Sequence, residues 1–388
     1  MKGRPGGSAL VAGLGVALIT AAAAFGPDHA TGRQPAPQAS AAYYGEDGPG
    51  EPTPGAETGA PAAAPLGRED AELSIVGSAD ECAAGPRLSG TFLQPYLAAG
   101  WSVSDWADEF RALNEACITE VVLQWTADSG AHTAVYPTGL SGYTQSAEQD
   151  LVGNALAAAD SVGMQIYLGL QVNDEWWNNY TGNAEWLAGE AAVAQALLDD
   201  LAHRYREHQS LAGWYLPFEV DNWHHPSQPA WDALSSFYAG VASRARALTP
   251  GLPVVIAPFF NPAGGLAPAQ WTEMWATILS GGHIDVIALQ DGVGAGHATT
   301  DQLVTWFAAT RAAIEQAGTS TELWADTETF TPGSQPMAVR DVVANMAAVD
   351  GYVSRYWSFS YNHYQSPRQV GPLYHQAYLG YLATGTVD

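Results

Sequence analysis

The sequence predicts an α/β fold of the (β/α)8 class, a TIM barrel, and three observations support this prediction. Eight short apolar runs occur between residues 88 and 361, and most end in an amide, a carboxylate or an aromatic residue. Stretches with the apolar spacing of amphipathic helices separate the runs, a pattern typical of a parallel sheet covered on both faces. Eight such units over about 300 residues fit a barrel whose usual length is ~250 residues before insertions.

Each run is expected to form one strand of the barrel. In chain order the runs are 88–94 (LSGTFLQ), 118–124 (ITEVVLQ), 164–171 (MQIYLGLQ), 213–219 (GWYLPFE), 253–260 (PVVIAPFF), 284–291 (IDVIALQD), 322–328 (ELWADTE) and 353–361 (VSRYWSFSY). Pro217 lies inside the fourth run. Because proline cannot donate a ladder hydrogen bond, we expect a bulge or an early end to pairing there.

The segments between the runs are expected to be helices. Trp106, Phe110 and Leu113 fall on one helical face after the first run, and Ser104 is the expected N-cap residue of that helix. Gly163 directly precedes the third run and is typical of a helix end. The alternation of strand and helix therefore continues along the chain.

The first 80 residues are expected to lie outside the barrel. Residues 1–26 are typical of a signal peptide, because Lys2 and Arg4 precede an uncharged apolar run with an alanine-rich end that offers a cleavage site. This run is near the ~18-residue length of a membrane span, so an uncleaved anchor is the alternative. Residues 27–80 are rich in Pro, Ala, Gly and Glu and are expected to form a disordered linker. The barrel domain then spans 81–388, without a later segment that could cross a membrane.

The chain contains two cysteines, Cys82 and Cys117. In an exported chain an even number of cysteines favours a disulfide, whereas the alternative is two buried thiols. We expect the disulfide, and with it a secreted or cell-surface protein.

The charge of the chain restricts its partners. It has 40 acidic and 14 basic residues, which gives a net charge of −26. Such a surface repels phosphate groups and argues against nucleic acid or anionic lipid as a partner. A neutral or cationic partner, such as a carbohydrate, fits better. We expect a monomer without a cofactor or a bound metal, since no motif for either ligand is recognisable.

The last positions of the runs carry the expected site, because TIM barrels place their active sites at the carboxyl ends of the strands. These positions are Gln94, Gln124, Gln171, Glu219, Phe260 with Asn261, Gln290 with Asp291, Glu328, and Tyr361 with Asn362. Strand ends that meet water are expected to be polar, but solvent contact alone does not explain why Gln and Glu are preferred at these positions. We expect the amides, Tyr361 and Asn362 to hold a substrate.

Glu219 ends the fourth run and Glu328 ends the seventh, so their carboxyl groups are expected to meet over the barrel mouth. Glycoside hydrolysis uses such a pair, one ionised nucleophile and one proton donor with a raised pKa. Asp326 shares a strand face with Glu328, and Asp291 is the acid if Glu219 is not. The alternative for each glutamate is an ion pair with Arg or Lys.

Tryptophans follow the third and fourth runs. Trp176, Trp177 and Trp223 lie in predicted loops, where an aromatic face suits the C–H face of a sugar ring. Asp221 lies beside Trp223, and together with His224 and Asp326 it suggests a metal site. The spacing fits no standard set of metal ligands, so solvated loop residues are the favoured interpretation.

The motifs GTFLQP, VVLQW, LGLQ, WYLPFEVDNW, APFF, ALQDGVG and LWADTETF, in this order, resemble those of the bacterial domain-of-unknown-function family 4434 (DUF4434) over about Leu88 to Leu382. That family is a group of glycosidase-like TIM barrels, similar to the glycosidases of clan A. The resemblance implies that Glu219 is the acid/base and Glu328 the nucleophile. One departure is Phe218, because clan A usually has an asparagine before the strand-four glutamate, where it binds the sugar 2-hydroxyl.

These observations lead to three functional hypotheses. The first is an exported hydrolase of a polysaccharide or oligosaccharide with a retaining two-glutamate mechanism. The second is a non-catalytic glycan-binding barrel on the cell surface. The third, which the sequence favours least, is a metal-assisted hydrolase.

Overall fold

The computed structural model describes Cys82, residues 85–179 and residues 183–387 of the 388-residue chain. The expected signal peptide (1–26) and linker (27–80) lie outside these residues, and both stay predictions. The expected barrel domain includes all of the described residues.

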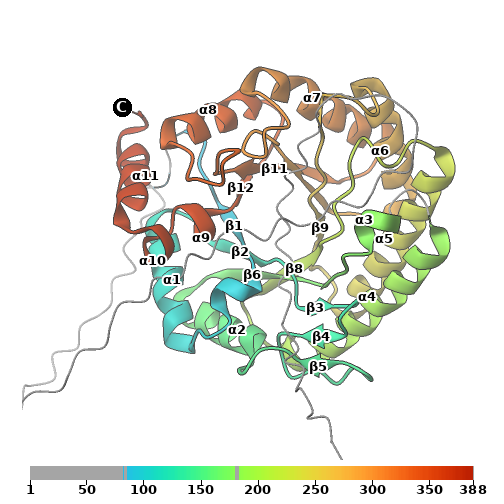
Figure 1. The fold of residues 1–388 in the computed structure, drawn as a ribbon, viewed down its shortest axis with the longest axis horizontal. Helices are drawn as coiled ribbons and strands as arrows, with labels where there is room; N and C mark the ends of the chain where they lie inside the picture. Colours follow the sequence, from blue (N-terminus) through green and yellow to red (C-terminus); the bar gives the residue numbers. More distant parts are fainter. Residues whose placement is uncertain (1–81, 83–84, 180–182, 388) are drawn as a thin grey trace, which may run out of the picture. The chain divides into compact units, whose positions relative to one another are not determined.

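Eight parallel strands form one sheet that closes into a barrel (Figure 1). In sheet order they are β1 (Gly90–Leu93), β2 (Glu120–Leu123), β6 (Gln165–Gly169), β8 (Leu211–Leu216), β9 (Val254–Ile256), β10 (Val286–Gln290), β11 (Glu322–Glu328) and β12 (Tyr356–Phe359). The first and last strands meet where Ser89 N donates a hydrogen bond to Tyr356 O over 2.8 Å. The predicted TIM barrel is confirmed, and each predicted run overlaps one of its strands.

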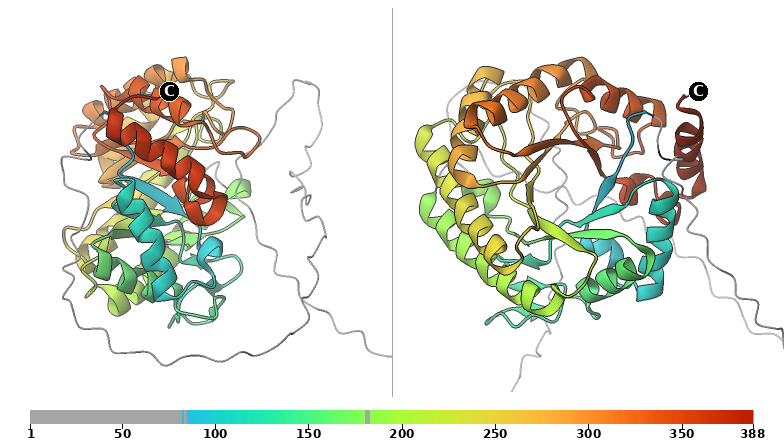
Figure 2. Two further views of the ribbon diagram at one scale, coloured as in Figure 1. Left: turned by 90° about the vertical axis from the view of Figure 1, so that its left-hand side faces the viewer. Right: turned by 180° about the vertical axis from the view of Figure 1, so that it is seen from behind.

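A ring of helices surrounds the strands, as the right-hand view of Figure 2 shows. The long helices are α1 (Val103–Glu115), α2 (Leu151–Val162), α4 (Ala184–Tyr205), α5 (Gln228–Leu248), α6 (Pro268–Gly282), α7 (Thr300–Ala317), α8 (Val339–Val349) and α11 (Pro372–Thr384). The N-cap of α1 is Ser102 instead of the predicted Ser104, because Ser102 and Asp105 form a reciprocal capping box. The face with Trp106, Phe110 and Leu113 is buried as predicted.

Short elements lie in the segments that follow the strands. They are η1 (Pro95–Ala98), α3 (Trp176–Asn179), α9 (Tyr361–Tyr364), α10 (Pro367–Val370) and a small sheet in the order β5 (Thr144–Gln145), β4 (Thr133–Ala134), β3 (Ala127–Asp128), β7 (Gln171–Val172). The third predicted run is therefore two strands. The barrel strand β6 ends at Gly169, and Gln171 begins β7.

The barrel has two hydrophobic cores. One lies between strands and helices, and the other fills the barrel interior with one or two side chains from each strand. The interior core consists of Phe92, Val122, Tyr167, Tyr215, Val255, Ala257, Val286, Ala288, Trp324 and Trp357. Because side chains alternate along a strand, these residues fix which positions further along each strand also face inward.

Two local features that the sequence predicted lie near the ends of the barrel strands. β8 ends at Leu216, directly before Pro217, so the expected early end of pairing is confirmed. Cys82 and Cys117 form the predicted disulfide, with 5.9 Å between their Cα atoms, and tie the segment before β1 to the segment before β2. In the described part of the chain, no helix is both long and apolar enough to span a membrane.

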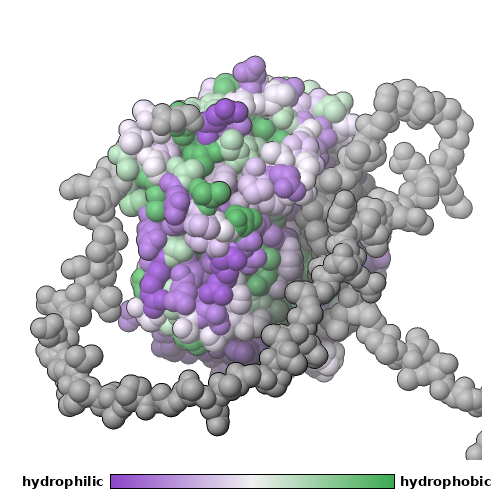
Figure 3. All heavy atoms as spheres, turned by 60° about the vertical axis from the view of Figure 1, so that its left-hand side comes forward, coloured by the Kyte–Doolittle hydropathy of each residue, from purple (hydrophilic) through white to green (hydrophobic). Residues whose placement is uncertain are grey.

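Figure 3 shows the described surface around the α1 and α11 side of the barrel. Hydrophobic residues form small groups between hydrophilic ones over the part that this view leaves uncovered. This distribution gives no argument for a second copy of the chain on this face, and the monomeric state stays a prediction.

Candidate active site

The strand alternation sends several predicted site residues into the mouth of the barrel. Gln94, Gln124, Gln290, Asp326 and Glu328 each lie two residues beyond an inward-facing residue of the same strand, so their side chains also face inward. Four of these side chains are nearly inaccessible to solvent, and Gln290 is half-buried. The preference for Gln and Glu at the run ends thus gathers amides and carboxyls in one place.

Four carboxyl groups form a cluster at this end of the barrel. Asp291, Asp326 and Glu328 are 1%, 2% and 4% exposed, and Glu219 is half-buried. The negative charges act on one another, since Asp291 and Glu219 both raise the pKa of Glu328. Among the described residues, none of the ion pairs involves any of the four carboxyls. The alternative of a glutamate paired with Arg or Lys therefore finds no support in the described part of the chain.

Burial raises the pKa of every member of the cluster, and repulsion by the other carboxyls adds to it for Asp326 and Glu328. Burial is the main cause for Glu219, whose pKa rises to about 7 although a hydrogen bond from Gln290 lowers it. The pKa of Asp291 also rises to about 7 through burial. Burial and then the neighbouring carboxylates raise the pKa of Asp326 and of Glu328 well above the usual value. Four carboxyls this close in a low-dielectric site cannot all be ionised, so the cluster retains protons near neutral pH.

The carboxyls differ in the hydrogen-bond donors that they receive. Glu328 Oε2 accepts the Ala295 N–H over 2.6 Å, and the Gly294 N–H also favours its ionised form. Asp291 Oδ1 accepts the Val293 N–H over 3.0 Å. Asp326 Oδ1 is buried without a hydrogen-bond partner. The backbone donors therefore favour the ionised forms of Glu328 and Asp291 against the effect of burial, whereas Asp326 Oδ1 has no such donor.

The loop after β10 supplies these donors because of its glycines. A Cβ atom on Gly294 would lie 2.5 Å from Phe330 O and 2.9 Å from Glu328 Cβ, so only glycine fits there. Gly292 has φ +68°, a left-handed conformation that glycine adopts readily. The glycine-rich segment after Asp291 is a tight βα loop, as predicted, and it wraps around the Glu328 carboxylate.

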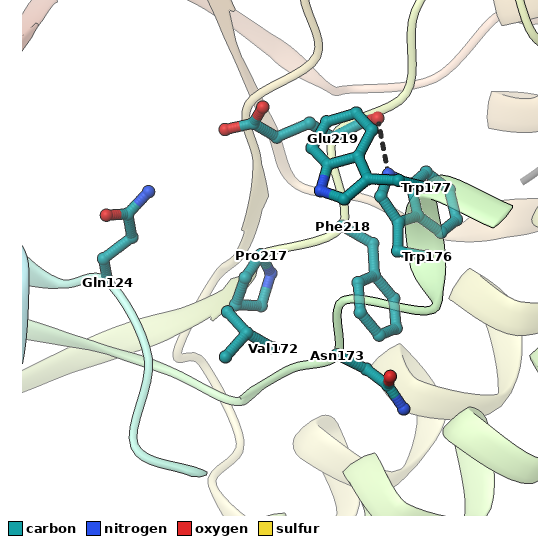
Figure 4. A pocket seen from close by; sticks show the side chains of 8 residues that line it. All are labelled: Gln124, Val172, Asn173, Trp176, Trp177, Pro217, Phe218 and Glu219. Atoms are coloured by element: carbon teal, nitrogen blue, oxygen red, sulfur yellow. Dashed lines mark hydrogen bonds between the residues drawn. The ribbon is translucent and has the colours of Figure 1, made fainter. Parts of the chain in front are cut away.

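A pocket borders the cluster on the Glu219 side. Its lining residues are Gln124, Val172, Asn173, Trp176, Trp177, Pro217, Phe218 and Glu219. Figure 4 shows the Glu219 carboxylate and the Gln124 amide extending toward the same space, with the Trp177 ring beside Glu219. The half-buried Trp177 is thus the lining tryptophan with a partly accessible ring.

Trp176 is buried and makes packing contacts that the sequence did not predict. It is 2% exposed, stacks on Phe218 with 5.1 Å between ring centroids, and donates its Nε1–H to Glu219 O over 3.1 Å. The expectation that the Trp176 face carries a sugar ring is therefore wrong. Trp176 instead positions the backbone of Glu219.

The loop after β8 is ordered by Asp221. Its carboxylate accepts hydrogen bonds from the backbone N–H of Trp223 (2.6 Å) and of His224 (2.9 Å), and pairs with His224 Nδ1 at 2.7 Å. Trp223 remains 41% exposed, and its Nε1 donates to Asn261 O over 3.1 Å. No group of three or more His, Cys, Asp or Glu side chains in the described residues is arranged to hold a metal ion. The combination of Asp221 and His224 with Asp326 thus gains no ligand geometry from the structure.

Four of the predicted strand-end positions lie outside the cluster. Gln171 Nε2 donates to Glu190 O (2.8 Å) and Oε2 (3.1 Å) on α4, because β6 has already ended. The Tyr361 hydroxyl bonds His375 on α11, and Asn362 Nδ2 donates to Glu109 Oε1 on α1 over 2.6 Å. Phe260 is buried and stacks on Trp306 of α7, with 4.9 Å between the ring centroids. Gln171, Tyr361 and Asn362 thus contact residues of the surrounding helices, and a substrate-binding role for them stays a prediction.

Sequence reasoning missed several residues at the mouth. Tyr96 donates its hydroxyl hydrogen bond to Gln94 Oε1 (2.7 Å) and lies 2.8 Å from His363 Nε2. Tyr364 stacks on Phe330 with 5.1 Å between ring centroids, and burial and then the charge of Glu328 raise its pKa. The available signal was the presence of aromatic residues directly after the first, seventh and eighth runs.

The fold is a TIM barrel, and its carboxyl cluster lies at the carboxyl ends of the strands. The chain belongs to the family described as Domain of unknown function (DUF4434), whose match covers residues 88–371. The family predicted from the motifs is therefore confirmed. No curated protein matches the chain.

Two solved structures show the same fold at low sequence identity. A "putative alpha-L-fucosidase" from Bacteroides thetaiotaomicron VPI-5482 is 21% identical, with a TM-score of 0.65 over 77% of this chain and 96% of its own. The endo-beta-1,4-mannanase from Thermotoga petrophila is 13% identical, with a TM-score of 0.52 over 79% of this chain and 78% of its own. These likenesses concern the architecture, and the chemistry has to be argued from the site.

Proposed function

We propose that the protein is a glycoside hydrolase that acts on a polysaccharide or oligosaccharide, with Glu328 as nucleophile and Glu219 as acid/base. The observation that carries the proposal is the carboxyl cluster, in which the two glutamates lie without a pairing cation among the described residues. Carboxyls with strongly raised pKa values at a strand-end site are typical of catalysis.

The donors assign the two roles. Glu328 receives two backbone N–H groups, which suit a carboxylate that must be ionised when it attacks. Glu219 has a pKa of about 7, so it still holds a proton near neutral pH and can give it to a leaving group. Burial raises the pKa of both glutamates, and the proposed mechanism needs Glu328 ionised when it attacks and Glu219 protonated when the leaving group departs.

The reaction follows from these roles. Glu328 attacks the anomeric carbon, the glycosidic C–O bond breaks, and Glu219 transfers its proton to the leaving oxygen. The Glu219 carboxylate then takes a proton from water, whose oxygen displaces Glu328 from the anomeric carbon. Two displacements retain the anomeric configuration.

The remaining polar residues of the mouth bind the sugar in this proposal. Gln94, Gln124 and Gln290 face the cluster and offer amide groups to hydroxyls. Phe218, which replaces the usual asparagine, stacks on Trp176 and cannot donate. We assign the contact with the 2-hydroxyl to Gln124, whose buried Oε1 has no hydrogen-bond partner.

The test is a hydrolysis screen of the full chain against a panel of glycans, followed by Glu328→Gln. The variant is expected to lose at least ~10³-fold in kcat, because the covalent step is removed. Glu315 forms an exposed ion pair with Arg311 on α7, and Glu315→Gln is the matched control, which is expected to keep the rate. Retention of full rate by Glu328→Gln contradicts the assignment.

A non-catalytic glycan-binding barrel is the second candidate, and one observation favours it. Asp291, Asp326 and Glu328 are almost completely covered, which suits acceptors that shape a binding site. Binding of a glycan by the unmutated protein without any turnover selects this candidate.

Export to the cell surface or medium belongs to both proposals, and the Cys82–Cys117 disulfide supports it.

A further inference from the structure

Six rings form a continuous array at the mouth, which we call the aromatic wall. It consists of Tyr96, Trp125, Phe330, Phe359, His363 and Tyr364, all half-buried. Neighbouring ring centroids are separated by 6.4 Å (Tyr96–Trp125), 5.8 Å (Tyr96–His363), 5.8 Å (Phe359–His363), 5.5 Å (His363–Tyr364) and 5.1 Å (Phe330–Tyr364). The rings come from the carboxyl ends of β1, β2, β11 and β12, four strands that follow one another around the closed barrel.

Hydrogen bonds hold part of this wall in place. Ser360 Oγ lies 2.9 Å from His363 Nδ1, and Tyr96 bridges Gln94 and His363. Burial lowers the pKa of His363 to about 4, so the ring is neutral at neutral pH. The wall therefore presents partly exposed, uncharged aromatic edges and faces that are fixed before any ligand arrives.

The wall and the Trp177 pocket lie beside different catalytic groups. Tyr364 is close enough to Glu328 for its charge to raise the tyrosine pKa, and Thr329 N donates to Phe359 O over 2.9 Å directly beyond Glu328. The pocket instead includes Glu219 in its lining. A sugar chain across the cluster thus meets aromatic surface on the Glu328 side and on the Glu219 side.

Neither surface carries a cation. The wall and the pocket lining contain no Arg or Lys, whereas Glu219 belongs to the pocket lining and is one of the four clustered carboxyls. Carboxylate or sulfate groups on a ligand are repelled there, and aromatic faces bind the C–H faces of uncharged sugars.

From this placement we infer that the aromatic wall binds the glycone part and the Trp177 pocket the aglycone part of one uncharged glycan chain. The orientation of the glycan in this inference rests on the proposed function, because the nucleophile contacts the glycone and the acid contacts the leaving group. The substrate class is then a neutral polysaccharide or oligosaccharide that extends on both sides of the cleaved bond.

Binding is tested first, in the Glu328→Gln background of the full chain, so that it does not depend on turnover. The probes are mannohexaose, xylohexaose and N-acetylchitohexaose, with hexagalacturonate as the anionic counterpart, in titration calorimetry. Tyr364→Ala and Trp177→Ala are each expected to weaken binding of a neutral probe ~2–10-fold, as the loss of one aromatic contact implies. Tyr352→Ala, a half-buried tyrosine in the loop that enters β12, is the matched control.

Cleavage position tests the assignment of the two sides. In the active chain, Trp177→Ala should move cleavage of a reducing-end-labelled hexasaccharide toward that end and shorten the labelled product. Tyr364→Ala should lengthen it, because glycone binding is weakened. The inference is overturned if hexagalacturonate binds as well as the neutral probes, if no neutral probe binds, or if both variants bind as the parent does. Reversed product lengths overturn the assignment of the wall to the glycone and of the pocket to the aglycone. Absence of turnover in the wild-type chain with intact binding contradicts the hydrolase proposal alone.

Discussion

The two ends of the barrel treat buried acidic residues in opposite ways. At the amino end, Glu120 is 4% exposed by its side chain and pairs with Arg355, and Trp357 Nε1 donates to it over 2.8 Å. Arg355 also lies 4.8 Å above the Trp324 ring. At the carboxyl end, four carboxyls share one site with few donors and no ion pair in the described part of the chain.

This difference separates stability from function. A buried carboxylate with a cation and a donor stabilises the ionised state and closes the bottom of the barrel. Buried carboxyls without cations repel one another, which destabilises the fold but leaves protons and charge available for chemistry. Substitutions at the carboxyl end should therefore change activity, and those at the amino end should change stability.

The largest expected effect is on activity at the carboxyl end. Glu219→Gln removes the proton donor, and kcat should fall ~10²–10⁴-fold, less for substrates with good leaving groups. In the wild type, kcat/KM should fall as pH rises through about 7, since Glu219 then loses its proton. Steady-state rates against pH check both points, with Glu273→Gln on the exposed face of α6 as control. A variant that keeps both the rate and the alkaline limb contradicts the role of Glu219.

The next effect is on stability at the amino end. Replacing Cys82 and Cys117 by Ser opens a loop with a sequence separation of 35 and should lower the free energy of unfolding by about 3 kcal/mol. Activity per folded molecule should not change, because the disulfide ties the segments that enter β1 and β2. Denaturant unfolding and rate measurements on the same samples compare the two quantities. A large loss of rate with unchanged stability would break the proposed division between the ends.

Glu120→Gln is expected to lower the free energy of unfolding by roughly 2 kcal/mol, because Arg355 loses its buried partner. Glu315→Gln removes an exposed pair with Arg311 and should change stability by less than ~0.5 kcal/mol. Thermal unfolding of both variants gives the comparison. Equal effects of the two substitutions would show that burial does not distinguish these ion pairs.

The last effect concerns pH and stability at the carboxyl end. Asp291 has a pKa of about 7 in the folded chain, against ~3.9 when unfolded. The folded state therefore holds the extra proton, and this contribution is full below pH ~4 and is lost as pH rises through about 7.

Asp291→Asn should reduce the loss of unfolding free energy between pH 5 and pH 8 by on the order of 1–3 kcal/mol. Denaturant unfolding at both pH values measures the difference. Asp232→Asn, on an exposed position of α5, should leave the pH dependence of the wild type unchanged. A steeper dependence in Asp291→Asn would reverse the sign that the burial of this carboxyl predicts.

The sequence by itself determined the strand number, the parallel order and the two-residue alternation within strands. Trp324, Asp326 and Glu328 show why, since one inward-facing residue fixes the direction of the others on a regular strand. Gln94, Gln124 and Gln290 face inward for the same reason, and their role in binding a substrate stays a prediction. The Cys82–Cys117 pair also followed from composition and predicted export.

Only the tertiary structure decided what happens beyond the last ladder hydrogen bond. After Gly169 and after Phe359 the chain leaves the barrel, so Gln171 and Tyr361 reach helices although their spacing points inward. Trp176 is buried against Phe218, and Tyr364 comes beside Glu328, through contacts between segments far apart in sequence. The physical reason is that alternation is a local property of a paired strand. Loop direction and carboxyl pKa values instead depend on burial and on charges that only the folded chain brings together.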